Sequence, residues 1–284
     1  MVDARAAEHV PSIPQTESAA YKLAFQDIEF LLREDLRPVR FQLELLKPEL
    51  FLNEANIGST FVFYGSARVP APDMADALVA AATNDEQRTI AERLKAKSPY
   101  YNIARELARL ASRCPADDEG KRHFVVCSGG GPSFMEAANR GAADEGQDSI
   151  GLNIVLPHEQ LPNPYVTPDL SFQFHYFALR KMHFLLRARA VAVFPGGYGT
   201  FDEMFELLTL VQTGKVRPLP ILLFGRDFWS RMVNFEGLAE EGVISPHDLD
   251  LIHWSEDADE AWDFVSRFYE EHPHPMPVQT APPE

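Results

Sequence analysis

The chain has little cysteine, few basic side chains and no long hydrophobic run. Its 284 residues include only two cysteines, Cys114 and Cys127, which rules out a disulfide scaffold and a cysteine-built zinc site. No uncharged apolar run reaches the roughly 18 residues that cross a bilayer. The first 21 residues lack the apolar segment of an export signal. We therefore expect an intracellular, cytoplasmic protein with no membrane partner.

The shortage of basic residues, 26 against 42 acidic ones, gives the chain a formal net charge of −16. A surface of this sign repels phosphate backbones at long range, so we do not expect a nucleic acid polymer as a partner. The charge does not exclude a small phosphorylated ligand that is held by a local cluster of donors. Apolar residues make up 45% of the chain, which is enough to bury the core of an ordinary globular protein.

The two ends of the chain differ from its centre. Residues 1–16 are polar and aperiodic, and residues 272–284 are rich in proline, so we predict that both segments are disordered. Residues 17–54 are predicted to form a helical arm that packs on the core or on a second subunit. Residues 55–271 are assigned to one main domain, in which residues 71–97 form an insert of helix and loop after the first strand.

Two helices are expected in the arm. From Ser18 onward, apolar residues recur at helical spacing as far as Leu32, and a second short helix follows Pro38.

In the main domain, short apolar runs alternate with helical patterns. Five runs read as strands that are covered on both faces: 60–64, 123–127, 149–156, 190–194 and 219–224. Five helical patterns separate or follow them: 98–113, 132–145, 175–189, 200–213 and 227–240. This alternation predicts an α/β fold, with a doubly wound, Rossmann-like parallel sheet and helices on both faces. Ligands of such sheets bind beyond the carboxyl ends of the strands.

Three of the strand ends are unusual. They read Gly65-Ser66-Ala67-Arg68, Ser128-Gly129-Gly130-Gly131 and Pro195-Gly196-Gly197-Tyr198-Gly199-Thr200. A glycine loop that leads into a helix presents unpaired N–H donors and the positive end of the helix dipole, which suits a phosphate. Each loop alone is more simply a tight turn without a ligand, but two at one sheet edge favour a phosphate site. Neither loop has the pattern for ATP or NAD, so a mononucleotide or sugar phosphate fits better.

Two readings stay open for the charged residues near these loops. Glu203 follows Thr200, and Glu136 follows Ser133, at the spacing of a capping box, so both glutamates could be purely structural. Alternatively, Glu203 lies beside the sugar of a bound ligand. Arg180 belongs to a basic helix face with His183 and Arg187, which could be a solvated stripe. No histidine pair has the spacing of metal ligands, and we expect no metal site.

The motifs together resemble one family. The segment from Pro195 to Glu203 is similar to the PGGxGTxxE signature of the Lonely-guy (LOG) phosphoribohydrolases, which act on nucleoside 5′-monophosphates of the cytokinin type. The pair Arg180-Lys181 resembles the RK that this family carries upstream. The run from Ser128 to Ala142 is similar to its glycine-rich phosphate loop, although Pro132-Ser133-Phe134 stands where many relatives have another glycine before the methionine. The resemblance covers residues 58–240.

This resemblance implies an N-glycosyl hydrolase that converts a nucleoside 5′-monophosphate, such as AMP or a cytokinin riboside 5′-monophosphate, to the free base and ribose 5-phosphate. Glu203 would stabilise the oxocarbenium-like sugar or orient water. Arg180 would orient Glu203 and the ribose, or assist the departure of the base. The resemblance also implies that Arg180 keeps Glu203 ionised. The resemblance implies no cofactor. It implies that the protein forms a homodimer or a larger homo-oligomer.

The remaining binding residues follow from the same resemblance. The 5′-phosphate would be held by main-chain N–H groups of the two glycine loops, with Lys181 as a phosphate or sugar contact. The residues assigned to binding are Gly129, Gly130, Gly131, Lys181, Gly196, Gly197, Tyr198, Gly199, Thr200, Asp202, Ser66 and Thr209. Family members are often labelled lysine decarboxylases, but no lysine here stands in a recognisable pyridoxal phosphate setting.

A second hypothesis remains from a different class of protein. Relatives on this fold include carriers of the molybdenum cofactor and nucleotide sensors, so the chain could bind a nucleotide or that cofactor without hydrolysis. The presence of both Arg180 and Glu203 favours the enzyme, because a binding protein needs the glycines but not this pair.

Overall fold

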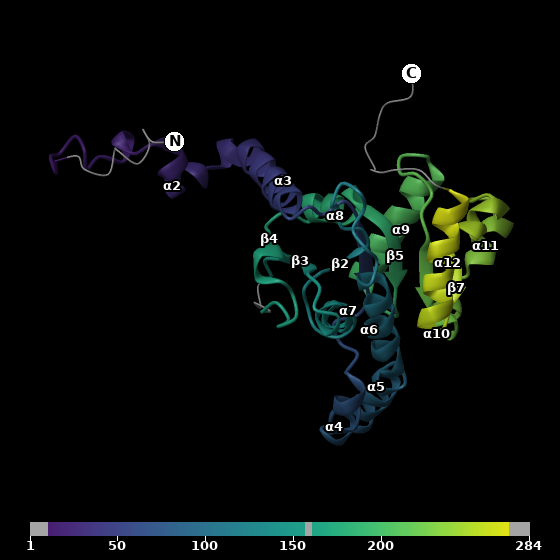
Figure 1. Ribbon diagram of the computed structural model, residues 1–284. Helices are drawn as coiled ribbons and strands as arrows, with labels where there is room; N and C mark the ends of the chain where they lie inside the picture. The colour runs from purple at the N-terminus through teal and green to yellow at the C-terminus, as the bar shows by residue number, and fades with distance from the viewer. Residues whose placement is uncertain (1–10, 157–160, 273–284) are drawn as a thin grey trace. The chain divides into compact units, whose positions relative to one another are not determined.

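The computed structural model describes residues 11–156 and 161–272 (Figure 1). Our predictions of disorder for residues 1–10 and 273–284 fall outside these ranges. By its internal contacts the chain divides into two compact units, Met1–Lys47 and Pro48–Glu284. None of the helices in the described ranges has the length and apolarity that crossing a bilayer requires.

The larger unit is built on one parallel sheet of seven strands in the order β4-β3-β2-β1-β5-β6-β7. The strands are β1 (Thr60–Tyr64), β2 (Val125–Ser128), β3 (Ser149–Ile154), β4 (Ser171–Phe174), β5 (Ala188–Val193), β6 (Ile221–Phe224) and β7 (His253–Ser255). The chain winds outward from β1 to β4, then returns to the centre and winds the other way from β5 to β7. The prediction of a doubly wound α/β fold is therefore confirmed. The winding reverses between β1 and β5, where ligands of such folds bind.

The five predicted strands are all present, with ends shifted by a few residues, and two more strands were missed. The missed strands, β4 and β7, lie at the two edges of the sheet. Both are short and only partly buried, so neither carries the continuous apolar run that marks the central strands.

Helices cover both faces of the sheet (Figure 1). On one face, α6 (Pro99–Ser112), α7 (Phe134–Asp144) and α12 (Ala258–Glu271) share a core with the strands. On the other, α8 (Phe177–Leu186) contacts β3 and β4, and α9 (Tyr198–Gln212) contacts β1. We did not predict α12, although Ala258, Ala261 and Val265 bury one face at helical spacing.

A ladder of stacked phenylalanines forms the middle of the core. The ring centroid of Phe194 lies 4.5 Å from that of Phe224, 5.1 Å from that of Phe134 and 6.4 Å from that of Phe63. Phe134 is the first residue of α7, so this packing fixes the start of the helix that follows the first glycine loop. A Cβ on Gly65 would lie 2.6 Å from the Phe134 ring, so the chain after β1 passes closely over it.

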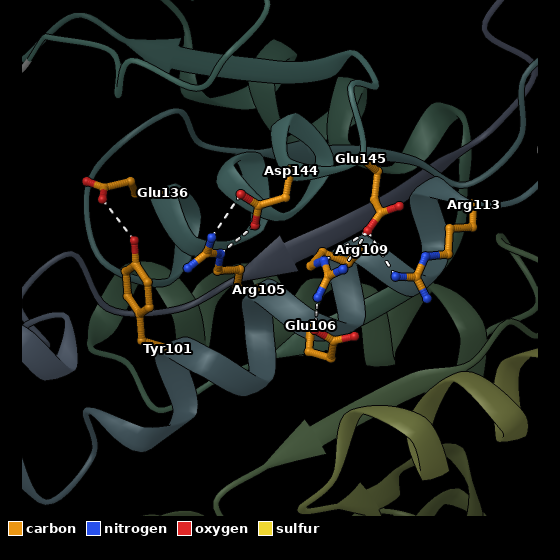
Figure 2. Close-up of polar contacts among 8 residues, drawn as sticks. All are labelled: Tyr101, Arg105, Glu106, Arg109, Arg113, Glu136, Asp144 and Glu145. Carbon is orange, nitrogen blue, oxygen red and sulfur yellow. Dashed lines mark hydrogen bonds and ion pairs between the residues drawn. The ribbon is translucent and has the colours of Figure 1, made fainter.

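Polar contacts hold α7 against α6 along its whole length (Figure 2). Tyr101 donates to Glu136 at 2.9 Å near the start of α7, and Arg105 makes two hydrogen bonds to Asp144 at its end. Glu145, just beyond the helix, accepts from Arg109 and Arg113. Exposed ion pairs contribute little one by one, but here they accompany close packing of the two helices. The helix is thereby a fixed support for the loop before it.

Elsewhere the helices differ from the predictions in detail. The residues from Ser18 to Leu32 form short turns, η2 (Ala19–Tyr21), η3 (Ala24–Gln26) and α2 (Ile28–Leu31), because the backbone is extended at Lys22 and Asp27. A further turn, η4 (Glu34–Leu36), leads into α3 (Arg37–Glu54), which is longer than the short helix we expected.

The predicted insert and the last predicted helix also resolve into smaller pieces. Residues 71–97 form helix and loop as predicted: η5 (Pro72–Met74), α4 (Ala75–Ala80) and α5 (Asp85–Lys95). The predicted helix 227–240 is wrong as one element. It is two helices, α10 (Arg226–Met232) and α11 (Phe235–Glu240), because Val233 is extended and Asn234 caps the second. A last turn, η7 (Pro246–Leu251), precedes β7.

Candidate active site

The loops after β1 and β5 meet where the winding of the sheet reverses. The register pairs Tyr64 with Val193, and the contact continues past both strands. The N–H of Phe194 donates to the carbonyl of Tyr64 at 2.8 Å, and that of Ser66 donates to the carbonyl of Pro195 at 3.1 Å. The structure thus brings the loop at Ser66 beside the loop that contains Gly196 and Gly197.

Arg180 and Glu203 form an ion pair at this edge, between α8 and α9. Their Nη1 and Oε1 atoms lie 3.4 Å apart, and the two side chains are only 11% and 15% exposed. Arg180 also donates from Nε to the carbonyl of Leu152 at 2.7 Å, and its guanidinium lies 5.0 Å from the centre of the Phe184 ring. The arginine therefore links the end of β3 to α9 in one fixed orientation.

Glu203 has an unusual pKa for a carboxyl group. Burial raises the pKa of Glu203 from 4.5 to about 7, because the lost hydration of the carboxylate outweighs the attraction of Arg180. The expectation that Arg180 keeps Glu203 ionised at neutral pH is therefore not supported, since Arg180 lowers the pKa by less than burial raises it. Carboxylates with such pKa values cluster at functional sites, since they can exchange a proton near pH 7.

The interpretation of the two glutamates as members of capping boxes is also wrong. Helix α9 begins at Tyr198 and not after Thr200, with Gly197 as its N-cap, so Thr200 lies inside the helix. The N-cap of α7 is Ser133, but its side chain makes no capping hydrogen bond. Glu136 accepts from Tyr101 instead, and Glu203 faces Arg180.

The basic helix face is not a solvated stripe. His183 is buried, and the side chain of Arg187 is 12% exposed and pairs with Glu49 at 2.7 Å. Together with the buried Arg180, these residues make α8 a helix that is held by its charged face as well as by its apolar one.

The first glycine loop lies directly against Arg180. A Cβ on Gly129 would lie 2.6 Å from Arg180 Nη2, and one on Gly130 would lie 2.4 Å from Asn153 Oδ1. Gly130 also has a φ of +72°, which favours glycine. Its N–H donates to Ser128 Oγ at 3.1 Å, so the expectation that this donor serves a phosphate is not supported.

The second glycine loop presents free helix donors. The first hydrogen bond within α9 runs from Phe201 to the carbonyl of Gly197 at 3.0 Å. The N–H groups of Tyr198, Gly199 and Thr200 therefore have no partner within the helix. Gly196 packs against the Thr200 side chain, while a Cβ on Gly197 or Gly199 would meet nothing within 4 Å.

The other predicted binding residues lie around this centre. Lys181 pairs with Asp202 at 2.9 Å and with Glu206 at 2.8 Å. Tyr198, the first residue of α9, is almost fully exposed, at 97%. Thr209 lies two turns further along α9 than Asp202, and its hydroxyl donates to the carbonyl of Phe205. Within the residues that the structure describes, no contact joins Thr209 to the ion pair of Arg180 and Glu203.

Two residues of this region were missed by the sequence analysis. Tyr64, the last residue of β1, is buried, and its ring makes an edge contact with Phe184 at 5.1 Å. Burial, followed by the negative charge of Glu203, raises the pKa of Tyr64 well above its usual value, so the phenol stays neutral. Asn153 supports Gly130 from β3. Both residues sit at strand ends, and that position was the signal that could have found them.

No group of three or more His, Cys, Asp or Glu side chains is placed to hold a metal ion in residues 11–156 and 161–272.

Ser133 carries local strain at the start of α7. Its φ of +65° lies in the region that favours glycine, and its buried hydroxyl finds no hydrogen-bond partner in the described ranges. Such strain costs about 1–3 kcal/mol. We expect Ser133→Gly to raise the free energy of unfolding by about 1–2 kcal/mol, measured by urea denaturation, after part of the gain is offset by greater freedom of the unfolded chain.

The control for this prediction is Ser133→Ala, which removes the hydroxyl but keeps a Cβ at positive φ. If alanine stabilises as much as glycine, the unpaired hydroxyl and not the backbone is the source of strain.

A family model described as "Possible lysine decarboxylase" matches residues 135–265. A pyrimidine/purine nucleotide 5′-monophosphate nucleosidase of Escherichia coli (strain K12) is 30% identical over 131 residues, which span 41% of this chain and 27% of that protein. The cytokinin riboside 5′-monophosphate phosphoribohydrolase LOG3 of Arabidopsis thaliana is 27% identical over 161 residues, 55% of this chain and 69% of that one. The chain therefore spans only about a quarter of the length of the bacterial relative.

Solved structures are similar at lower identity. One titled TM1055 has a TM-score of 0.46 at 20% identity and covers 74% of this chain and 99% of its own. A molybdenum cofactor carrier protein of Chlamydomonas reinhardtii has a TM-score of 0.42 at 16% identity, with coverages of 75% and 99%.

The fold and the paired loops define a Rossmann-like α/β protein whose winding reverses between β1 and β5, the place at which ligands of such folds bind. The stretch of the chain that is similar to the family described as "Possible lysine decarboxylase", residues 135–265, includes Arg180, Glu203 and the second glycine loop.

The decarboxylase description does not fit the lysine at this site. Burial alone would lower the pKa of Lys181, but its hydrogen bonds to Glu206 and Asp202 raise the pKa above its usual value. A lysine that forms a Schiff base must instead lose its proton readily.

Proposed function

We propose that the protein hydrolyses the N-glycosidic bond of nucleoside 5′-monophosphates and releases the free base and ribose 5-phosphate. The observation that carries this proposal is the part-buried ion pair of Arg180 and Glu203, which lies between two glycine loops at the reversal point of the sheet. The printed activities of the Escherichia coli and Arabidopsis thaliana relatives support it. AMP and a cytokinin riboside 5′-monophosphate are the proposed substrates.

The 5′-phosphate would bind to main-chain donors. These are the N–H groups of Gly131, Gly199 and Thr200 and of the first turn of α7, which lie at helix starts where the dipole favours an anion. Lys181 would contact the phosphate or the sugar with its ammonium, which Asp202 and Glu206 hold on the surface of α9. Phosphate recognition of this kind needs no net positive charge on the protein.

The carboxylate of Glu203 would act at C1′ of the ribose. As the bond from C1′ to the base nitrogen lengthens, positive charge develops on the sugar, and an adjacent carboxylate stabilises it. Water then adds its oxygen to C1′, the departing base takes the electron pair of the broken bond, and one proton of the water balances the charge on the base. Arg180 would hold Glu203 in place and polarise the ribose side of the site.

A cytoplasmic location and a homodimer or larger homo-oligomer are part of the same proposal. Exposed apolar side chains in residues 17–54 support the homo-oligomer, among them Phe25, Ile28 and Leu43.

The deciding experiment is the incubation of the purified protein with a panel of nucleoside 5′-monophosphates, followed by chromatography of the bases. We expect base release, and kcat/KM for the best substrate should rise about tenfold per pH unit below pH 7 and level off above it. The reason is that Glu203, with its pKa raised to about 7, must be ionised to stabilise the sugar. Binding of AMP without release of any base would instead point to a nucleotide-binding protein.

A further inference from the structure

A buried polar network supports the first glycine loop from behind. Ser128 donates from Oγ to Asn139 Oδ1 at 2.7 Å, and Asn163 donates from Nδ2 to the same oxygen at 2.9 Å. All three residues are at least nine-tenths buried. The network joins the end of β2, the middle of α7 and the segment that follows β3.

Asn163 engages two successive carbonyl groups of the loop. Its main-chain N–H donates to the carbonyl of Gly130 at 2.8 Å, and its Nδ2 donates to the carbonyl of Gly131 at 3.0 Å. In a trans peptide the carbonyl and the following N–H point in opposite directions. The bond to Gly130 therefore turns the N–H of Gly131 to the side of the loop that faces away from Asn163.

The consequence for an anion is direct. A loop that binds phosphate must present N–H groups and hide its carbonyl oxygens, which repel a negative charge. The N–H of Gly130 is taken up by Ser128, and Pro132 has no N–H at all, so among residues 130–132 Gly131 is the one that can offer a main-chain donor. The orientation of that single donor depends on Asn163.

We propose that Asn163 is a positioning residue that sets the first glycine loop for recognition of the 5′-phosphate. This inference rests on the proposed function for the identity of the ligand. The residue touches no reacting atom; it acts through the carbonyls of Gly130 and Gly131. It lies 32 residues from the loop that it orients, and no spacing motif connects the two.

A purely structural asparagine would behave differently on substitution. Loss of buried hydrogen bonds would lower stability, but it would not change the preference for a ligand with a phosphate over the same ligand without one. The ratio of affinities for AMP and adenosine therefore separates the two roles, because both ligands share every contact except those to the phosphate.

The experiment measures the binding of AMP, adenosine and ribose 5-phosphate by calorimetry to the full chain and three variants. Asn163→Ala removes the side chain. Asn163→Asp keeps the size but cannot donate to Gly131 or to Asn139, so it releases the anchor that places the main-chain N–H of residue 163 on the Gly130 carbonyl. Asn234→Ala is the matched control, because Asn234 also fixes the backbone, through Gly237 at the start of α11, in a different part of the fold.

We expect both Asn163 variants to bind AMP and ribose 5-phosphate about tenfold or more weakly, as for the loss of one charge-assisted hydrogen bond. Their affinity for adenosine should change less than twofold. The Asn234 variant should lower the melting temperature and leave the ratio of AMP to adenosine affinity unchanged. If Asn163→Asp keeps the wild-type ratio, or if AMP and adenosine weaken equally, the inference is overturned. If Asn163→Ala does not fold, Asn163→Asp alone decides.

Because these are binding measurements, they stand apart from the test of hydrolysis. A protein that binds AMP and releases no base would refute the proposed reaction and leave the role of Asn163 open to the same measurement. Conversely, base release with an unchanged affinity ratio in the variants would refute only the positioning role.

Discussion

Glu203→Gln should lower kcat for the release of base from AMP by about 10²- to 10⁴-fold. The amide has the size and shape of the carboxyl group, so it fills the same space beside Arg180 on α9. It lacks the negative charge that opposes the positive charge on the ribose, and it cannot accept a proton near pH 7. KM should change little, because the phosphate contacts are untouched. Rates of base release, measured by chromatography at pH 8, test this directly.

The matched control is Glu136→Gln. Glu136 follows Ser133 at the spacing at which Glu203 follows Thr200, and the sequence suggests the same capping role for both. In the structure Glu136 accepts from Tyr101 on α6, a bond that a glutamine oxygen can still accept. Its turnover should stay within a fewfold of wild type. Near-normal hydrolysis by Glu203→Gln would refute the catalytic assignment, and equal losses in both variants would indicate a general effect on the fold.

Glu203→Gln should also stabilise the protein, and increasingly so as pH rises. With a pKa of about 7 in the folded state against 4.5, Glu203 binds a proton more tightly when folded. Wild-type stability is therefore lost between these two pH values as pH rises, because the unfolded chain releases the proton first. The cost reaches about 3 kcal/mol above pH 7. Glutamine does not ionise, so the variant avoids this cost. Its gain in unfolding free energy should be under about 1 kcal/mol at pH 5 and about 3 kcal/mol at pH 8.

Urea denaturation of both proteins at the two pH values measures this difference. A gain that is the same at pH 5 and pH 8 would show that burial does not disfavour the ionised form of Glu203. The experiment is independent of any substrate, so it tests the electrostatics of the site even if the reaction is different.

The sequence predicted the parts of this molecule that depend on local pattern. Continuous apolar runs located the five central strands, and glycines placed after two of them indicated the ligand edge. The same local reasoning misplaced the start of α9 by two residues, because Gly197 provides an N-cap that needs no side chain. That small difference decides whether Thr200 caps the helix, and hence whether Glu203 is bound to the backbone or faces Arg180.

What could not be predicted depends on distant partners. The raised pKa of Glu203 comes from its burial, which is a property of the packed fold and of no segment. Similarly, Asn139 and Asn163 are ordinary polar residues in the sequence and become a network only when β2, α7 and the chain after β3 are brought together. The edge strand β4 was missed for the same reason, since its burial comes from neighbours that are remote in the chain.

The pairing of β1 with β5 has a consequence for how the molecule acquires its activity. Thr60 is registered with Ala188, so the centre of the sheet closes a loop of more than a hundred residues. Contacts between residues this far apart in the sequence form late in folding. The chain must first lose conformational entropy to close the loop, and only then do the contacts offset that loss. The candidate active site lies across that seam. During synthesis it cannot exist before β5 has left the ribosome, and on refolding the return of activity should lag behind the return of helical signal.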